Sequence, residues 1–353
     1  MALRVGLPAG GAAVVAFTIS LVVALTSAAA PARPSARPTL PPHPQPAPTR
    51  VVSTQLYSPF TGEPVRALEP VLAVKIDNIV TARPQTGLQS ADIVYVEPVE
   101  GGLTRFMAVF SSRVPAAVGP VRSARESDLK LLPQFGRPAF AWSGATPHLV
   151  PFIERARIAD LYALQVGGYY RISSRAAPEN LYANPRTLLK EAPKASDARD
   201  IGFRFGPQPA GGPQPAGGRA TASYSVSYPA ARYTFRWSAA AKRWLVWMDG
   251  APGRATEGGQ LGGATVIIQY VGIRTSRFEE YGGLPPLAES VGSGRAVILR
   301  NGRAYTAGWS RPSLNGGTTF TLPGGQRMLF APGQVWVVLA PENHASYVNA
   351  ARV

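Results

Sequence analysis

The sequence predicts an α/β or α+β N-terminal domain with a mixed sheet, followed by a smaller C-terminal domain that is mostly β. Between residues 71 and 110, short runs rich in β-branched and aromatic residues are bounded by Gly, Pro or Asn, which is typical of buried strands. Between residues 126 and 192, helix-like segments alternate with a further strand, as in α/β and α+β folds. Beyond residue 219, apolar residues recur at every second position, which is the period of a half-buried strand.

The N-terminal domain is expected to hold four strands and three helices. The strands are predicted at residues 71–76, 93–96, 105–110 and 140–142. The helices are predicted at residues 126–132, through residues 154–156 and at residues 187–192. Ser123 or Ser127 would begin the first helix and Ser143 or Thr146 the second, because Ser and Thr side chains cap helix N-termini.

The C-terminal domain is expected to be a small barrel or sandwich. Apolar residues alternate with polar ones from Tyr233 to Trp237 and again from Trp244 to Met248, which predicts a hairpin. Further strands are predicted at residues 266–270, 296–299, 318–321 and 335–339, with turns at Asn301-Gly302 and Gly324-Gly325.

The first 55 residues indicate export. Residues 10–30 carry no charge and end in Ser-Ala-Ala-Ala, so residues 1–30 are predicted to be either a cleaved signal peptide or a retained N-terminal membrane anchor. Residues 31–55 are rich in proline and are predicted to form a semi-extended tether. The protein is therefore expected to be extracytoplasmic, secreted or membrane-anchored, in the cell envelope.

A tandem GPQPAG repeat separates the two predicted domains. Residues 206–218 consist of this repeat and one further glycine, Gly218, which cannot build a core and are predicted to be a linker. The α/β ligand-binding domain is accordingly expected to span residues 56–205, and the mostly-β domain residues 219–353.

Composition excludes several kinds of site. The chain has no cysteine, which excludes disulfides, thiolate metal sites, cysteine nucleophiles and lipid attachment through a lipobox. The three histidines include His43 in the tether, so a histidine-rich zinc site is not expected. The net charge of +16 favours anionic partners such as phosphate polymers or lipids, whereas export and the lack of a reader motif argue against nucleic acid. No cofactor and no metal are expected.

Charged and polar residues gather at the ends of the predicted N-terminal strands, where α/β folds usually place ligand sites. The candidate ligand-binding residues are Asp77, Asn78, Arg83, Asp92, Glu97, Glu100, Arg105, Arg122, Ser123 and Arg125. Arg122 and Arg125, in the motif GPVRSAR, could bind a phosphate or carboxylate through bidentate contacts. They could equally pair with nearby acids and lock the ends of the sheet together.

Two carboxylates lie close together at the end of the second predicted strand. Glu97 and Glu100 flank Pro98-Val99 just before two glycines, and such a pair could serve as acid and base in glycoside cleavage. With Asp77 they could instead hold a divalent ion, although paired acids in loops are also common without catalysis. Ser123 has no histidine at a position that would mark it as a nucleophile. The sequence leaves open whether the protein is an enzyme.

Several long motifs resemble those of the YerB-like bacterial envelope proteins. They are IDN, ARPQTGL, ADIVYVEPVEGGLTRFMAVF, GPVRSAR and PENLY in the first half, and GSGRAVILRNGRAYTAGWSRP and APGQVWVVLAP in the second. The resemblance covers roughly residues 57–341 and implies an extracytoplasmic, two-part protein that contains a domain of largely unassigned function. Many relatives are lipoproteins, whereas this chain lacks a lipobox cysteine, and the family usually has His where this chain has Glu179.

The combined prediction is a cell-envelope protein that binds an anionic wall component or partner through an arginine-rich cleft. The partner would be an anionic wall polymer, a lipid-linked precursor or an envelope protein. One alternative is an enzyme that acts on cell-wall glycan or polyprenyl-phosphate substrates, by analogy with the LytR–CpsA–Psr ligases. Another is a scaffold that recruits wall-synthesis proteins through its β domain.

Overall fold

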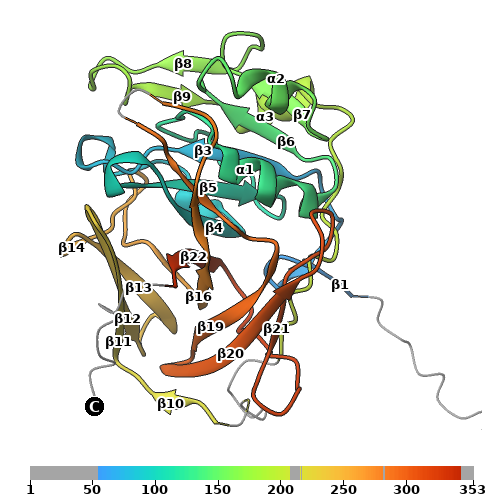
Figure 1. Cartoon of the computed structure of the whole chain (residues 1–353), viewed down its shortest axis with the longest axis vertical. Coiled ribbons are helices and arrows are strands. Elements are labelled where there is room, and N and C mark those ends of the chain that lie inside the picture. Colours follow the sequence, from blue (N-terminus) through green and yellow to red (C-terminus); the bar gives the residue numbers. More distant parts are fainter. Residues whose placement is uncertain (1–54, 207–214, 216, 281–282, 343–353) are drawn as a thin grey trace, which may run out of the picture. The chain divides into compact units, whose positions relative to one another are not determined.

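One large mixed sheet runs through both halves of the chain (Figure 1). The computed structural model describes residues 55–206, 215, 217–280 and 283–342. The predicted signal peptide or anchor, the tether up to residue 54 and most of the repeat linker lie outside these residues. In spatial order the strands of the large sheet are β10 (Arg219–Ala220), β20 (Arg303–Arg311), β19 (Gly292–Arg300), β16 (Thr265–Val271), β22 (Val335–Pro341), β4 (Ile93–Pro98), β5 (Thr104–Phe110), β3 (Leu72–Ile76), β6 (Ala139–Trp142) and β7 (Ala159–Tyr162), and β21 (Thr319–Thr321) pairs with β20.

The two halves meet at a parallel pair of strands in the middle of this sheet. β22 of the second half pairs with β4 of the first half, in a register that runs from Val335 opposite Ile93 to Val338 opposite Val96. Both strands are buried along this pairing, as expected for the interior of a sheet that is covered on both faces. The predicted mixed sheet is thus confirmed, and it extends into the second half of the chain.

Strand directions bring several strand ends to one edge of the sheet. β3 and β4 both run antiparallel to β5, and β3 runs parallel to β6. The C-terminal ends of β3, β4 and β6 therefore lie beside the N-terminal end of β5. This edge, called the polar edge below, carries most of the candidate residues.

Smaller sheets complete the fold. A five-stranded sheet contains β11 (Ser223–Tyr228), β12 (Ala231–Ser238), β13 (Arg243–Met248), β14 (Ala251–Pro252) and β15 (Gly262–Gly263). Two-stranded sheets form from β1 (Leu56–Tyr57) with β2 (Pro64–Val65), β8 (Tyr169–Arg171) with β9 (Leu181–Ala183), and β17 (Ile273–Thr275) with β18 (Pro286–Ala288). The predicted hairpin is β12–β13, where Trp237 lies opposite Trp244.

The helices of this protein are shorter than those usual in an α/β domain. Within the described residues the α-helices are α1 (Glu126–Leu131), α2 (Val150–Glu154) and α3 (Pro185–Glu191), and the 3₁₀-helices are η1 (Val80–Ala82), η2 (Leu88–Ser90), η3 (Glu100–Gly102) and η4 (Leu132–Phe135). The expectation of a substantially helical N-terminal domain is therefore wrong. Proline explains part of this, because Pro133 lies two residues after the end of α1 and the chain continues there as a 3₁₀-helix. The predicted serine and threonine caps are also wrong, since Arg125 and Leu149 occupy the N-cap positions of α1 and α2.

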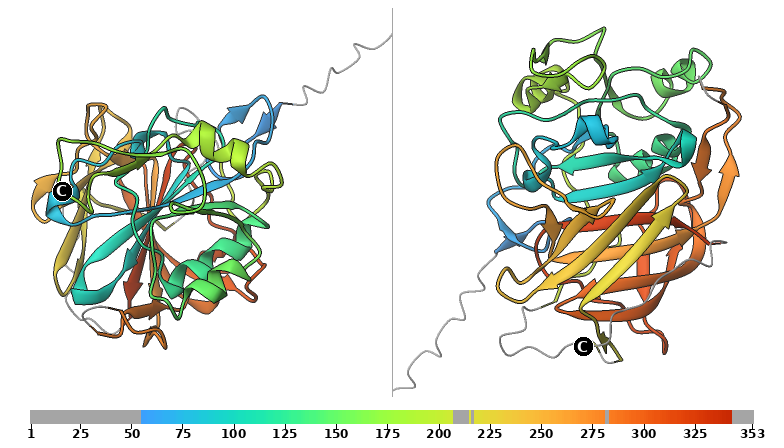
Figure 2. Two further views of the ribbon diagram at one scale, coloured as in Figure 1. Left: turned by 90° about the horizontal axis from the view of Figure 1, so that it is seen from above. Right: turned by 90° about the vertical axis from the view of Figure 1, so that its left-hand side faces the viewer.

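The core lies on both faces of the large sheet. On one face, the five-stranded sheet packs against it (Figure 2, right). Trp336 of β22 meets Phe106 of β5 and Phe235 of β12 there, at ring-centroid distances of 5.6 and 6.2 Å. On the other face, Phe135 of η4 meets Tyr95 of β4 at 6.4 Å. No helix in the described part of the chain has the length and apolar character needed to cross a membrane.

Candidate functional site

A buried lysine lies between two carboxylates just beneath the polar edge. The Lys75 ammonium, on β3, is 3.1 Å from Glu97 of β4 and 2.8 Å from Asp128 of α1. All three side chains are fully buried. Sequence reasoning selected Glu97 but missed Lys75 and Asp128. The available signal was a single lysine inside the apolar run VLAVKI, on the strand face that also carries Ala73.

This triad retains a proton on Glu97. Burial and the charge of Asp128 raise the pKa of Glu97, Lys75 opposes both effects, and the resulting pKa is about 8. A single ammonium cannot neutralise two carboxylates. A bound proton on Glu97 therefore leaves a buried group of Lys75 and Asp128 that is electrically balanced.

The triad also fixes the segment that carries the candidate arginines. Asp128 accepts a hydrogen bond from the backbone N–H of Arg125 at 2.6 Å, at the N-terminus of α1. The carbonyl oxygen of Lys75 accepts a hydrogen bond from the backbone N–H of Arg122 at 2.8 Å. The GPVRSAR segment is thus held at two points by residues of the triad.

Three arginines and three carboxylates form a cluster on the polar edge. The arginine cluster consists of Arg105, Arg122, Arg125, Asp77, Glu100 and Glu280. Glu100 accepts hydrogen bonds from Arg105 at 3.2 Å and from Nε of Arg125 at 2.8 Å, and Nη2 of Arg125 contacts the same carboxylate. Arg125 also lies 3.2 Å from Glu280, which the sequence did not single out. The predicted convergence of Asp77, Glu100 and the three arginines is present in this arrangement.

The charges of the arginine cluster perturb one another. Burial would raise the pKa of Glu100, but hydrogen bonds from Arg125 and the charge of Arg105 outweigh it and lower the pKa to about 2. Burial and the neighbouring Arg125 lower the pKa of Arg105 to about 10. Glu100 therefore stays ionised at neutral pH, and Arg105 stays cationic.

Arg122 differs from the other two arginines. Its Nε donates to Asp77 at 2.7 Å, and Asp77 is almost completely buried. Its side chain is 25% exposed, and its two terminal nitrogens make no hydrogen bond or ion pair with the described residues. The neighbouring Ser123 is half-buried, and its carbonyl oxygen accepts from Arg105 at 3.0 Å. Arg122 therefore presents unused donors at the surface, oriented by a buried carboxylate.

Asn78 and Arg83 belong to an adjoining network. Arg83 donates to the carbonyl oxygen of Asn78 at 2.8 Å and pairs with Asp249 at 2.7 Å. The Asn78 amide donates to Thr104 at 3.1 Å and contacts the hydroxyl of Tyr233. These bonds join the end of β3 to the five-stranded sheet, so both residues have structural partners.

Asp92 lies apart from the other candidates, and its predicted place in the site is wrong. It precedes β4, whereas Glu97 is near the end of that strand, so the two are separated by about 16 Å along the chain. Asp92 accepts hydrogen bonds from the backbone N–H groups of Ser111 and Ser112 at 2.7 and 2.8 Å. Burial raises its pKa to about 6. The sequence showed that Asp92 and Glu97 lie near opposite ends of one strand, but not that only Glu97 lies near the polar edge.

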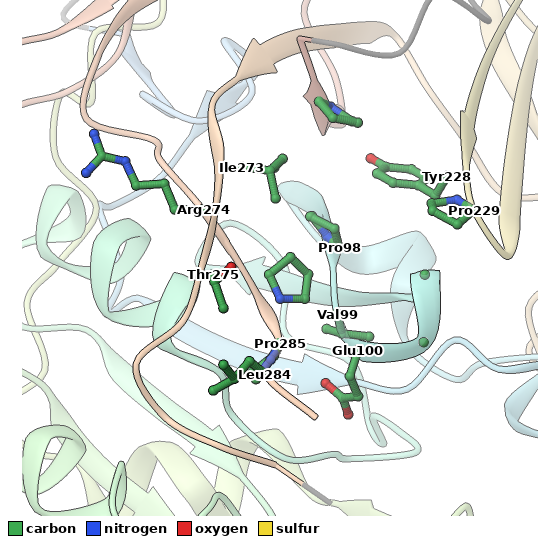
Figure 3. A pocket seen from close by; sticks show the side chains of 14 residues that line it. Pro98, Val99, Glu100, Tyr228, Pro229, Ile273, Arg274, Thr275, Leu284 and Pro285 are labelled. Carbon is green, nitrogen blue, oxygen red and sulfur yellow. The ribbon is translucent and has the colours of Figure 1, made fainter. Parts of the chain in front are cut away.

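A cavity of about 380 Å³ adjoins the arginine cluster at Glu100 (Figure 3). Its walls come from Pro98 at the end of β4, residues 99–102 after it, Tyr228-Pro229, Ile273–Thr275, Leu284–Pro286 and Pro341. Figure 3 shows Glu100 on the side of the cavity where Leu284 and Pro285 lie. Proline has no N–H group, so these walls are mainly apolar and offer few hydrogen-bond donors.

Comparison with known proteins identifies a family that spans most of the chain. Residues 60–199 match the N-terminal domain, and residues 224–337 the C-terminal domain, of a family described as "Protein of unknown function (DUF3048)". The chain is 27% identical over 310 residues to "Putative lipoprotein YerB" of Bacillus subtilis (strain 168), which covers 84% of this chain and 89% of that protein.

The fold is also similar to a solved structure. The crystal structure of the YerB protein from Bacillus subtilis matches with a TM-score of 0.67 at 23% identity, over 82% of this chain and 97% of that one. The resemblance inferred from the motifs is thereby confirmed. The two family domains correspond to the two halves that share the large sheet, and the chain belongs to the YerB-like DUF3048 family.

Proposed function

We propose that this protein is an extracytoplasmic cell-envelope protein that binds an anionic ligand through Arg122 on the polar edge. The exported location is supported by the uncharged N-terminal run and by a relative named as a putative lipoprotein. The binding function rests on one observation, the two terminal nitrogens of Arg122 that face solvent without a partner among the described residues.

The surroundings of Arg122 suit it to bind a phosphate or a carboxylate. Asp77 holds the Nε side of the guanidinium at 2.7 Å and so restricts its orientation, which lowers the entropy lost on binding. A planar guanidinium can then donate two parallel hydrogen bonds to an oxyanion. The cluster contains as many carboxylates as guanidiniums, so attraction depends on these directed bonds rather than on net charge.

The geometry does not favour the acid–base alternative. Glu97 has no exposed surface through which a substrate could reach it. Glu100 has a pKa of about 2, so at neutral pH it is a weak base and carries no proton to donate. A set of three or more His, Asp or Glu side chains placed to hold a metal ion is also absent from the part of the chain that the structure describes.

The test is ligand binding to the full-length chain and to matched variants. Inorganic phosphate, poly(glycerol phosphate) and muropeptides would be screened by thermal shift, in which a ligand at 100 times its Kd stabilises the fold by about 2.7 kcal/mol. Arg122→Ala should weaken binding of the best probe about 10- to 100-fold, because a hydrogen bond to a charged group contributes roughly 1.5–3 kcal/mol. Arg122→Lys should keep the fold and the pairing with Asp77 but lose the bidentate contact, with an intermediate affinity.

Arg113→Ala is the matched control. Arg113 is half exposed and follows β5 at the opposite edge of the sheet, so its loss makes the same change in charge away from Arg122. Equal affinity of the wild type and both Arg122 variants, or no binding of any probe, would refute the proposal. Binding of a protein partner that is indifferent to Arg122 would support the scaffold alternative.

A further inference from the structure

Strand β11 leaves one edge of its backbone unpaired. It is an end strand of the five-stranded sheet, and β12 is its neighbour on the other side. The N–H of Trp237 donates to the carbonyl oxygen of Ala222, and hydrogen-bonded pairs alternate along an antiparallel ladder. The backbone N–H and C=O groups of Ser223, Ser225 and Ser227 therefore point away from β12. These groups have no hydrogen-bond partner within the described residues.

The free edge of β11 lacks the features that usually prevent strand pairing. Exposed edge strands are commonly interrupted by charged side chains, proline or a bulge. The sequence of β11, SYSVSY, contains neither charge nor proline, and its register with β12 is regular from Ser223 to Tyr228. Its serine side chains lie on the outer face of the sheet (Figure 2, right), because Val226 is buried on the inner face. Such an edge can accept an added strand.

One guanidinium without a counter-charge lies beside this free edge. Arg232 of β12 is directly opposite Ser227, and its Nε donates to the Ser227 hydroxyl at 3.2 Å. Arg232 is exposed, and its two terminal nitrogens make no hydrogen bond or ion pair with the described residues. Arg232 and Asp249 help to line a hollow of about 460 Å³ at this end of the sheet. The Asp249 carboxylate pairs with Arg83 at 2.7 Å, so the charge of Arg232 remains available to a ligand.

We propose that β11 binds an extended peptide of another protein as an added strand, and that this peptide carries an acidic side chain opposite Ser227. The peptide backbone continues the ladder at Ser223, Ser225 and Ser227. The side chain opposite Ser227 projects from the same face of the sheet, about 5 Å further along the hydrogen-bonding direction. There its carboxylate accepts hydrogen bonds from the terminal nitrogens of Arg232. This inference does not rest on the proposed anion site at Arg122.

Charge decides between the possible occupants of the free edge. All 20 acidic residues of the chain lie within the described ranges, so the segments outside them supply no acidic side chain. A second copy of β11, paired antiparallel about a two-fold axis at Ser225, would place its own Ser223 opposite Ser227. Arg232 would then have no carboxylate to bind. Complementarity of charge therefore favours an acidic peptide over self-association.

The test is binding of two synthetic peptides to the full-length chain. The probes are acetyl-Glu-Val-Thr-Val-Thr-Val-amide and the same peptide with Gln in the first position, which lies opposite Ser227 in antiparallel pairing. Hydrogen exchange reports protection of the amides of Ser223, Ser225 and Ser227, and fluorescence anisotropy of labelled peptides gives the affinity. The Glu peptide should protect these three amides and bind about tenfold more tightly than the Gln peptide, because hydrogen bonds between charged groups are the stronger ones.

Variants of the chain separate the side-chain contact from the backbone contact. Arg232→Ala should lower the affinity for the Glu peptide to that for the Gln peptide. Arg236→Ala is the matched control, because Arg236 lies on the same strand and face but stacks on Trp247, 4.5 Å from the ring centroid, and its loss should change neither affinity. Ser225→Pro removes an N–H that the sheet does not use and should abolish binding of both peptides, whereas Ser225→Ala should retain it.

Several outcomes would overturn the inference. Absence of protection by both peptides would do so, as would equal affinities of the wild type for the Glu and Gln peptides. If Ser225→Pro does not fold, the Glu peptide N-methylated at its third residue takes its place, and tight binding of that peptide would contradict strand addition. Dimerisation in sedimentation runs with protection of the same three amides would assign the free edge to a second copy. Protection of these amides in the peptide-free monomer would assign it to another segment of the chain.

Discussion

Replacing Glu97 by glutamine should remove a pH dependence that is built into the core. Glu97 retains its proton when folded because its pKa is raised to about 8, whereas its ordinary value is 4.5. The folded state thus binds a proton that the unfolded chain releases between these two values. The contribution of Glu97 to stability is therefore fully present below pH 4.5 and is lost as the pH rises toward 8.

The size of the effect follows from the pKa. One pKa unit corresponds to about 1.36 kcal/mol, so the loss over this window is of the order of 5 kcal/mol. Between pH 6.5 and 8 it amounts to about 2 kcal/mol. The amide introduced by Glu97→Gln can donate to Asp128 and accept from Lys75, as the protonated acid does, but it cannot ionise.

The assay is urea unfolding of the wild type and Glu97→Gln at several pH values from 6.5 to 9. This range avoids Asp92, whose pKa of about 6 gives both proteins a slope at lower pH. The unfolding free energy of the wild type should fall across the range, and the advantage of Glu97→Gln should grow by about 2 kcal/mol. Asp128→Asn, which removes the charge beside Glu97, should also reduce the slope. Parallel stability curves for the wild type and Glu97→Gln would show that Glu97 is ionised in the folded protein.

Two further predictions concern packing. Trp336→Ala should destabilise the fold by about 3–5 kcal/mol in urea unfolding, because Trp336 is fully buried between Phe106 and Phe235 where β22 joins β4, and a loss below about 1 kcal/mol would contradict this packing. Gly102→Ala should cost about 1–3 kcal/mol, because Gly102 has a φ of +70° and a Cβ there would lie 2.6 Å from Pro229, and unchanged thermal unfolding would show that the turn beside the cavity can adjust.

Local patterns predicted the strands better than they predicted the residues that share a site. Runs such as IVYV and FMAVF correctly indicated β4 and β5, because β-branched and aromatic residues fill both faces of a covered sheet. Arg122 of the GPVRSAR motif pairs with Asp77, one of the three acids that the sequence offered as its partner. Lys75 was missed because its hydrogen-bond partner Asp128 is 53 residues away, and no local pattern encodes that pairing.

The pairing of β22 with β4 was equally hidden from the sequence. Each strand is an apolar run, and such a run does not indicate which other strand it pairs with. The repeat that begins at residue 206 also suggested that the two halves are separate domains. Helices were predicted at or next to the places of α1, α2 and α3, but they are short, so the α/β class overstated the helical content. The sequence thus pointed to the GPVRSAR motif, but it did not reveal the buried Lys75, Glu97 and Asp128 group beneath it.

The shared sheet also dictates an order of assembly. β4 is complete about 240 residues before β22, and at roughly 5–20 residues per second the ribosome needs about 12–50 s to produce the missing neighbour. Throughout that interval β4 can pair with β5 on one side only, and its other edge is a template for pairing with other nascent chains. We therefore expect this edge of β4 to need protection from such pairing until β22 has been made.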